Sequence, residues 1–340
     1  MSSTQQLLVS PSPHIHSGDT IERNMRDVIF ALMPAMGVSI FFFGMGALWV
    51  TLTSICACLL FEWVISRFLL GRKELTILDG SAVLTGILLG MNLPSTLPLW
   101  IVVVGALVAI GIGKMSFGGL GCNIFNPAIV GRVMLLISFP VQMTSYPMPR
   151  SSELVNAATS ASVVDATSGA TPLAIAKGTI RGAEGFTLDK LPDLFDNFIG
   201  GVGGSLGEVS AIALLLGFVY LLIRKVITWH IPVAIIGTVA LFAGAMHLAN
   251  PEVYAGPLFH ILSGGMLIGA IFMATDYVTS PMSKGGMIVY GVLIGIITML
   301  IRLFGAYPEG MSFAILVMNG IVPIINRYMP PHLFGKAKKS

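Results

Sequence analysis

The residues with the most specific chemistry lie in one polar segment, Asp165-Ala-Thr-Ser-Gly-Ala-Thr171. A threonine hydroxyl that a second enzyme is to esterify must be presented on accessible backbone. The Gly and Ala before Thr171 remove bulk beside it, and Pro172 bars a helix from running through the segment. Asp165 suits the docking of such an enzyme or of its metal ion. On composition alone, a polar loop that happens to be rich in Ser, Thr, Gly and Ala is the simpler explanation.

A second group of polar residues follows a glycine-rich turn at 118–121, where Asn123 and Asn126 are three residues apart. Backbone that breaks a helix at membrane depth is tolerated only beside protein or a cavity. Both side-chain amides are then able to face the polar edge of a ligand's ring. Pro127 suits the first turn of the next helix. A ligand site and ordinary capping by asparagine explain the pair equally well, and both interpretations stay open.

Asp276 is a carboxylate at the end of the apolar run 258–274. Its carboxylate is able to bind a polar ligand or a cation, or it simply ends a helix. N-capping explains Asp79, which begins another apolar helix. The three cysteines form neither a zinc motif nor a disulfide framework, so no metal site is predicted.

The composition predicts that lipid is the solvent for most of these elements. Of 340 residues, 55% are hydrophobic and 10% are charged, and the mean hydropathy is +0.87. A soluble domain carries roughly 25% charged residues. The net charge of +3 is too small and too scattered to indicate a nucleic-acid partner.

Apolar runs long enough to cross a bilayer recur along the chain, because a span needs about 20 mostly apolar residues. They predict an all-α polytopic membrane protein with about ten transmembrane helices. The runs are 28–68, which is long enough for two helices, 77–91, 97–114, 124–143, 206–223, 231–248, 258–274, 287–304 and 311–325. Glu62 is an outlier in its run and is expected to face protein or a polar cavity rather than lipid.

The distribution of Lys and Arg in the short loops predicts the orientation, because these residues are enriched on the cytoplasmic side. With the N-terminus inside, every short loop that carries them falls inside, and both termini are cytoplasmic. The predicted organisation is a cytoplasmic arm, a first five-helix repeat, an extracytoplasmic loop with the Thr171 segment, a second five-helix repeat and a cytoplasmic tail. Their ranges are 1–27, 28–143, 144–205, 206–326 and 327–340.

The two halves show traces of an internal repeat. Residues 79–92 align with 263–276 without a gap, and 126–132 resemble 319–327 with a small insertion. Five spans in each half give the halves opposite orientations, which is the inverted-repeat plan of many transport folds. The matching segments are short and apolar, so chance similarity is the alternative.

Several of these segments resemble one family of electron-transport proteins. The Asp-x-x-Ser-Gly-Ala-Thr pattern is similar to the sequence on which flavin transferases attach FMN, through its phosphate, to threonine. Segments 12–17, 27–35, 117–128 and 273–276 also match. Together they resemble the family that contains the D subunit of the Rnf ion-translocating complex and the B subunit of the sodium-pumping NADH:quinone reductase. The absence of a long N-terminal extension favours the Rnf subunit.

The resemblance implies a membrane flavoprotein subunit of a redox-driven Na⁺ or H⁺ pump, with ferredoxin and NAD as the redox partners of the complex. It implies covalent FMN on Thr171, within a motif that includes Asp165, Ser168, Gly169 and Ala170. It implies a second, noncovalent flavin, riboflavin, for which the candidate residues are Asn123, Asn126 and Asp276. Implied partners are a second covalent-flavin subunit, iron–sulfur subunits and a flavin transferase, in a bacterial inner membrane. A passive channel with a urea-transporter-like fold is the rival function, because fold does not fix function.

Overall fold

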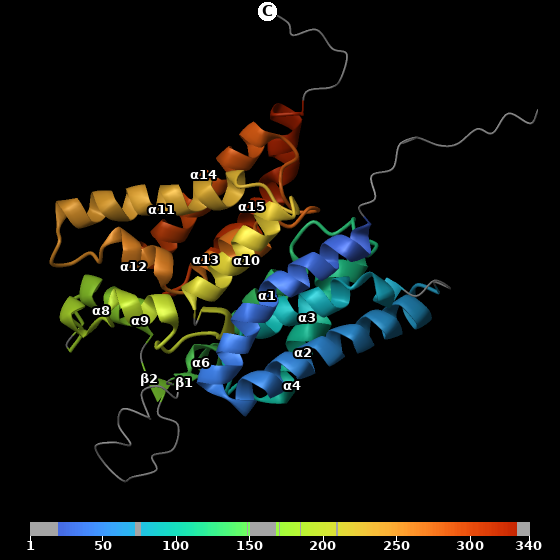
Figure 1. Ribbon diagram of the computed structural model, residues 1–340, viewed down its shortest axis with the longest axis horizontal. Coiled ribbons are helices and arrows are strands. Elements are labelled where there is room, and N and C mark those ends of the chain that lie inside the picture. Colours follow the sequence, from blue (N-terminus) through green and yellow to red (C-terminus); the bar gives the residue numbers. More distant parts are fainter. Residues whose placement is uncertain are drawn as a thin grey trace, which may run out of the picture.

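The computed structural model describes residues 20–71, 76–147, 149, 168, 169, 171–183, 185–208 and 210–331. Asp165, Ala170, the first 19 residues of the N-terminal arm and the last nine of the C-terminal tail lie outside the described residues. Within them the fold is helical except for a two-stranded ladder between β1 (Tyr146–Pro147) and β2 (Ser168–Gly169) (Figure 1). The predicted all-α class is therefore confirmed.

The N-terminal half begins with a helical hairpin. Helix α1 (Ile21–Phe43) ends at Gly44, whose φ of 67° turns the chain directly into α2 (Met45–Val64). Helix α3 (Ser81–Met91) packs closely on α2, because a Cβ on Gly86 would lie 2.6 Å from the Cα of Ile55. Small residues that let two helices approach this closely are typical of membrane interfaces.

The rest of this half contains helices with irregular turns. Helix α4 (Leu99–Leu107) continues through the π-helical turn η3 (Val108–Lys114), and α5 (Pro127–Ser138) follows the glycine-rich turn. A short helix, α6 (Pro140–Thr144), leads to β1. Two further short helices, α8 (Pro172–Ile180) and α9 (Leu194–Ile199), gather with α12 (Pro257–Leu262) at one end of the molecule (Figure 1).

The C-terminal half contains α10 (Ala211–Ile223), α11 (His230–Ala249), α14 (Lys284–Phe304) and α15 (Met311–Tyr328). Helices α11 and α14 pack along each other, and α10 packs on α1 of the first half. A Cβ on Gly217 would lie 2.3 Å from the carbonyl oxygen of Ala31, and Arg224 forms an ion pair with Asp27 at 3.0 Å. The two halves therefore meet along α1 and α10 (Figure 1).

Six helices of the described chain are long and apolar enough to cross a membrane, so this is a multi-pass membrane protein. They span Ile21–Phe43, Met45–Leu69, Leu99–Phe117, His230–Ala249, Lys284–Phe304 and Met311–Tyr328. Three shorter apolar helices are Ser81–Met91, Pro127–Ser138 and Ala211–Ile223.

One predicted span is interrupted. The run 258–274 forms α12, a break at Ser263–Gly265, then α13 (Met266–Ile268) and the π-helical turn η7 (Gly269–Met273). Gly264 in the break has a φ of 72°, a left-handed conformation that glycine adopts without steric cost. The predicted total of about ten spans and the inverted repeat remain predictions.

Candidate functional site

Thr171 lies where the β-ladder passes into a helix. Strand β2 pairs antiparallel with β1, with Tyr146 opposite Gly169, and the chain then enters α8 at Pro172. Thr171 is the N-cap of this helix, and its Oγ accepts a hydrogen bond from the backbone N–H of Ala174 at 3.2 Å. The expectation that Pro172 keeps a helix from running through Thr171 is confirmed, because α8 begins at that proline.

This position suits a phosphoester. The first N–H groups of a helix have no partner within the helix, and together with the helix dipole they attract anions. In the described structure the Thr171 oxygen acts only as an acceptor, so replacing its hydrogen by phosphorus removes no donor from the cap. The residue is half-buried, and it faces a recess.

Helix α8 is held by two cations. Lys177 donates to the carbonyl oxygens of Ile301, at 3.1 Å, and of Tyr307, while Arg181 donates to Gly305 at 2.8 Å. Gly305 and Tyr307 lie just beyond the C-terminal end of α14, where carbonyls have no helical partner, and Ile301 O in its last turn accepts from Lys177 in addition to the Gly305 N–H. Burial, and then the nearby Arg181 charge, lower the pKa of Lys177 to about 8. Thr171 therefore stands on a helix that is fixed to the bundle.

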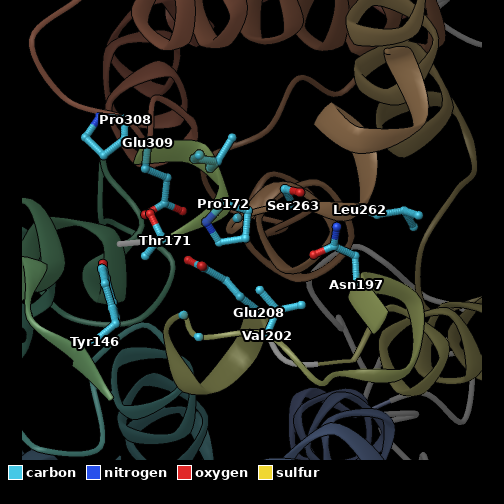
Figure 2. A pocket seen from close by; sticks show the side chains of 14 residues that line it. Tyr146, Thr171, Pro172, Asn197, Val202, Glu208, Leu262, Ser263, Pro308 and Glu309 are labelled. Carbon is cyan, nitrogen blue, oxygen red and sulfur yellow. The ribbon is translucent and has the colours of Figure 1, made fainter. Parts of the chain in front are cut away.

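The recess beside Thr171 has a volume of about 480 Å³, including its open mouth (Figure 2). Its walls come from β1, α9, the segment before α10, the break at Ser263–Gly265 and the loop between α14 and α15. Two lining side chains are buried yet incompletely paired: Asn197 is 4% exposed and Ser263 is 3% exposed. The Asn197 Nδ2 and Ser263 Oγ atoms have no hydrogen-bond partner within the described part of the chain. A recess with such atoms offers hydrogen-bonding groups to a polar ligand.

A charged cluster lies at the recess. Arg132 of α5 donates to Asn92 and to Glu309, and its Nη2 lies 3.7 Å from Oε1 of Glu208. The second oxygen of Glu309 accepts from the backbone N–H of Gly265 at 2.8 Å. This cluster was missed by the sequence reasoning. Isolated charges within or beside apolar runs could have indicated it, because charged residues at membrane depth usually have a partner and a function.

The residues Asn123, Asn126 and Asp276, predicted separately, line one hollow of about 420 Å³, together with Lys114 and Ser81. A second hollow of about 420 Å³ shares Asp276 with it. The structure thus brings together the three residues that the sequence suggested for a noncovalent ligand.

The two asparagines differ in how far they are already committed. Asn126 is the N-cap of α5: its Oδ1 accepts from Ala128 N at 3.1 Å and Ile129 N at 3.4 Å, and its Nδ2 donates to Met273 O. Asn123 donates to Phe125 O, while its buried Oδ1 has no partner among the described residues. Capping therefore explains Asn126, and Asn123 retains a free acceptor.

A buried ion pair borders this hollow. Lys114 donates to Glu62 at 2.7 Å and to the Ser81 hydroxyl at 2.6 Å, and Ser81 donates in turn to Asp79 at 2.5 Å. Glu62 thus faces protein rather than lipid, as expected. Asp79 also accepts from the Ser81 backbone N–H at 2.8 Å, so it binds the first residue of α3, but the N-cap is Gly80 and the expected N-cap role of Asp79 is wrong. Asp276 is half-buried and accepts from Thr279 at 3.0 Å.

Comparison with known proteins places the chain. Residues 8–335 match the NQR2, RnfD, RnfE family. The D subunit of a proton-translocating ferredoxin:NAD⁺ oxidoreductase complex from Clostridium ljungdahlii is 42% identical, and the match covers 96% of both chains. The D subunit of a Na⁺-translocating ferredoxin:NAD⁺ oxidoreductase complex from Acetobacterium woodii is 41% identical over 98% of this chain and 96% of the relative. The D subunit of an ion-translocating oxidoreductase complex from Stutzerimonas stutzeri is 40% identical over 93% of each. With near-complete coverage at these identities, the chain belongs to the NQR2, RnfD, RnfE family.

Proposed function

We propose that this chain is the D-type membrane subunit of an ion-translocating ferredoxin:NAD⁺ oxidoreductase and carries FMN esterified through its phosphate to Thr171. The observation that carries the proposal is the position of Thr171. The motif that resembles a flavinylation sequence ends at a helix N-terminus that faces a partly polar recess. Family membership and the named relatives supply the complex to which such a subunit belongs.

The residues present fit such a group. The positive end of the α8 dipole suits the phosphate, and the incompletely paired Asn197 and Ser263 suit the polar edge of a flavin or its ribityl chain. A bound flavin supplies the electron-accepting chemistry, while the protein supplies position, burial and electrostatics. Asp165, Ser168, Gly169 and Ala170 complete the motif that a flavin transferase recognises.

We also propose that the hollow at Asn123, Asn126 and Asp276 takes a second, noncovalent flavin, riboflavin. The free Oδ1 of Asn123 is the acceptor available to a ring N–H. The two sites flank the ends of one helix: Asp276 precedes α14 and Glu309 follows it. A helix of 21 residues is roughly 30 Å long, which is the thickness of the hydrocarbon core. Carriers near opposite faces of the membrane suit electron transfer across it.

The inverted-repeat architecture is part of the proposal, and three features support it. Gly80 and Gly264, aligned in the repeat, both adopt left-handed φ values, 78° and 72°. Asn126 and Asn319, which are also aligned in the repeat, are in contact. With the Asn319 amide oriented so that both its nitrogen and its oxygen have partners, the oxygen accepts from the backbone N–H of Asn126 at 3.0 Å. In each half a basic side chain also binds next to the aligned glycine. Lys114 donates to the hydroxyl of Ser81, the residue after Gly80, and Arg302 donates to the carbonyl oxygen of Ser263, the residue before Gly264.

Localisation and partners follow from the same proposal. The subunit lies in the bacterial inner membrane with both termini in the cytoplasm, beside a second covalent-flavin subunit and iron–sulfur subunits. The coupling ion is not fixed by similarity, since relatives at 42% and 41% identity are named for different ions, protons and Na⁺.

Fluorescence of the denatured subunit on a gel under ultraviolet light tests this function, because only covalent flavin survives denaturation. The wild-type band is expected to fluoresce, and Thr171→Ala is expected to be dark although the subunit still inserts. Thr171→Ser keeps a hydroxyl and is expected to retain some signal. Thr179→Ala, at the other end of α8, is the matched control and should fluoresce fully. A fluorescent Thr171→Ala band would place the flavin elsewhere, and a dark wild-type band would favour a passive channel.

A further inference from the structure

We propose that Glu208 is a redox-linked proton site: its carboxylate takes up a proton when the flavin on Thr171 is reduced and releases it on reoxidation. The inference rests on the proposed function, since it requires a flavin at Thr171. It assigns a role to a charged side chain that neither the flavinylation motif nor the noncovalent site uses.

The first support is position. Glu208 and Glu309 line the same recess as Thr171, and Figure 2 shows both carboxyl groups pointing into it. Glu208 comes from the 3₁₀ turn η6 (Leu206–Glu208), before α10 begins. Its side chain is 11% exposed, so it is largely shielded but reachable from the mouth of the recess.

The second support is the difference between the two carboxylates. Glu309 has both oxygens engaged, one by Arg132 and the other by the backbone N–H of Gly265. The Oε1 of Glu208 is 3.7 Å from Arg132 and has no hydrogen-bond partner among the described residues. Hydrogen bonds to a carboxylate favour its ionised form, and burial without them disfavours it. Glu208 is therefore the acid of this pair that gains a proton more easily.

The third support is the electrostatic surroundings. The charged and titratable groups that act on Glu208 are Arg132 of α5, Glu309, Tyr146 of β1 and Arg302 of α14. Burial, followed by the Glu309 charge, raises the pKa of Glu208 to about 7, against the opposing effect of Arg132. Burial therefore favours the protonated form of Glu208 more than that of an exposed carboxyl group, and an additional negative charge nearby favours it further.

The step balances in charge and atoms. For each two electrons that the donor of the complex delivers, one proton from the outer aqueous phase binds the flavin ring, which becomes an anion. A second proton binds Oε1 of Glu208, which becomes a neutral carboxylic acid. Two electrons and two protons enter, so the net charge of the recess does not change. Charge neutrality matters there because an uncompensated charge costs far more in a low-dielectric site than in water. When the electrons leave, both protons return to solvent.

Redox-induced infrared difference spectra of the purified complex test the proposal. Reduction of the wild type is expected to produce a protonated-carboxyl C=O band that shifts in D₂O and is lost in Glu208→Gln. Glu252→Gln, which removes an exposed acid from the 250–256 loop, should keep the band. The covalent-flavin midpoint potential should also rise in Glu208→Gln, because the ionised carboxylate that opposes reduction is gone, and it should depend less on pH around 7.

The outcomes separate the two proposals. An unchanged carboxyl band in Glu208→Gln with its full in-gel flavin fluorescence overturns the role of Glu208 and leaves the proposed function intact. Absence of covalent flavin in the wild type overturns the proposed function itself. If Glu208→Gln does not accumulate, Glu208→Asp keeps a carboxyl group in a shifted position. A shifted carboxyl band in that variant supports the proposal, and an unshifted one refutes it.

Discussion

The oxygen of Thr171 combines two roles that are usually separate. As the N-cap of α8 it accepts from Ala174, a contribution worth about 1 kcal/mol of helix stability in typical cases. As an ester oxygen it would tie a phosphate to the same helix end, where the helix dipole favours an anion. The free hydroxyl has no donor role in the described structure, so esterification and capping are compatible.

The two asparagines of the inner hollow give a prediction at the residue scale. Asn123→Leu is expected to lower the flavin released by mild denaturation, because the free acceptor is lost, and to leave the Thr171-linked flavin unchanged. Asn126→Leu should instead lower the melting temperature, because losing the N-cap of α5 costs about 1 kcal/mol of stability. Asn250→Leu, at an exposed position, is the control. Stoichiometric extractable flavin in Asn123→Leu would reduce that residue to a structural role.

The sequence was informative about residues whose role depends on their neighbours in the chain. Pro172 marks the start of α8, and Asn126 followed by proline marks the start of α5. It was uninformative about Arg132, Glu208 and Glu309, which are far apart in the chain and meet only in the fold. Charge alone does not say which of several isolated ions will pair.

At the scale of elements, α8 depends on the end of α14. Lys177→Met keeps most of the side-chain volume and removes the ammonium that donates to Ile301 and Tyr307. Hydrogen bonds from a charged donor contribute about 1.5–3 kcal/mol, so α8 should undock more often. Hydrogen exchange of residues 172–183 in the purified complex is expected to accelerate.

Lys190→Met is the matched control for this prediction, because Lys190 is exposed and donates only locally, to Gly185. Exchange in α8 should stay at the wild-type rate in this control. If Lys177→Met also exchanges at the wild-type rate, the Lys177 hydrogen bonds do not hold α8 in place. Packing of Leu173 and Ala176 against Phe259 would then be sufficient to dock the helix.

The interrupted run at 258–274 shows why helix breaks were harder to predict than helices. Its apolar composition is continuous, and Gly is frequent in transmembrane helices without breaking them. What interrupts the run is tertiary: Glu309 engages the N–H of Gly265, and Arg302 donates to the carbonyl of Ser263. These partners come from α14 and from the loop that follows it, so local propensity could not reveal them. The long helices α1, α2, α11, α14 and α15 overlap their predicted runs because an apolar run of sufficient length decides them.

At the scale of the whole molecule, sidedness can be tested with introduced cysteines. On a background without Cys56, Cys58 and Cys122, Glu252→Cys should react with an impermeant maleimide in cells with a permeabilised outer layer. Lys284→Cys, at the opposite end of the bundle, should react only after lysis. Both positions are exposed, so access and not burial decides the labelling. The reverse pattern would place the Thr171 recess in the cytoplasm, beyond the reach of an extracytoplasmic flavin transferase.

Peptide mass spectrometry of the subunit purified from the native complex tests the central claim most directly. Cleavage after Arg150 and Lys177 yields a peptide that contains Thr171. The proposal requires this peptide to carry the mass of FMN less one water, with fragment ions that place the addition on Thr171. An unmodified Thr171 in a fully assembled and active complex, or a flavin on another residue of the peptide, would contradict it.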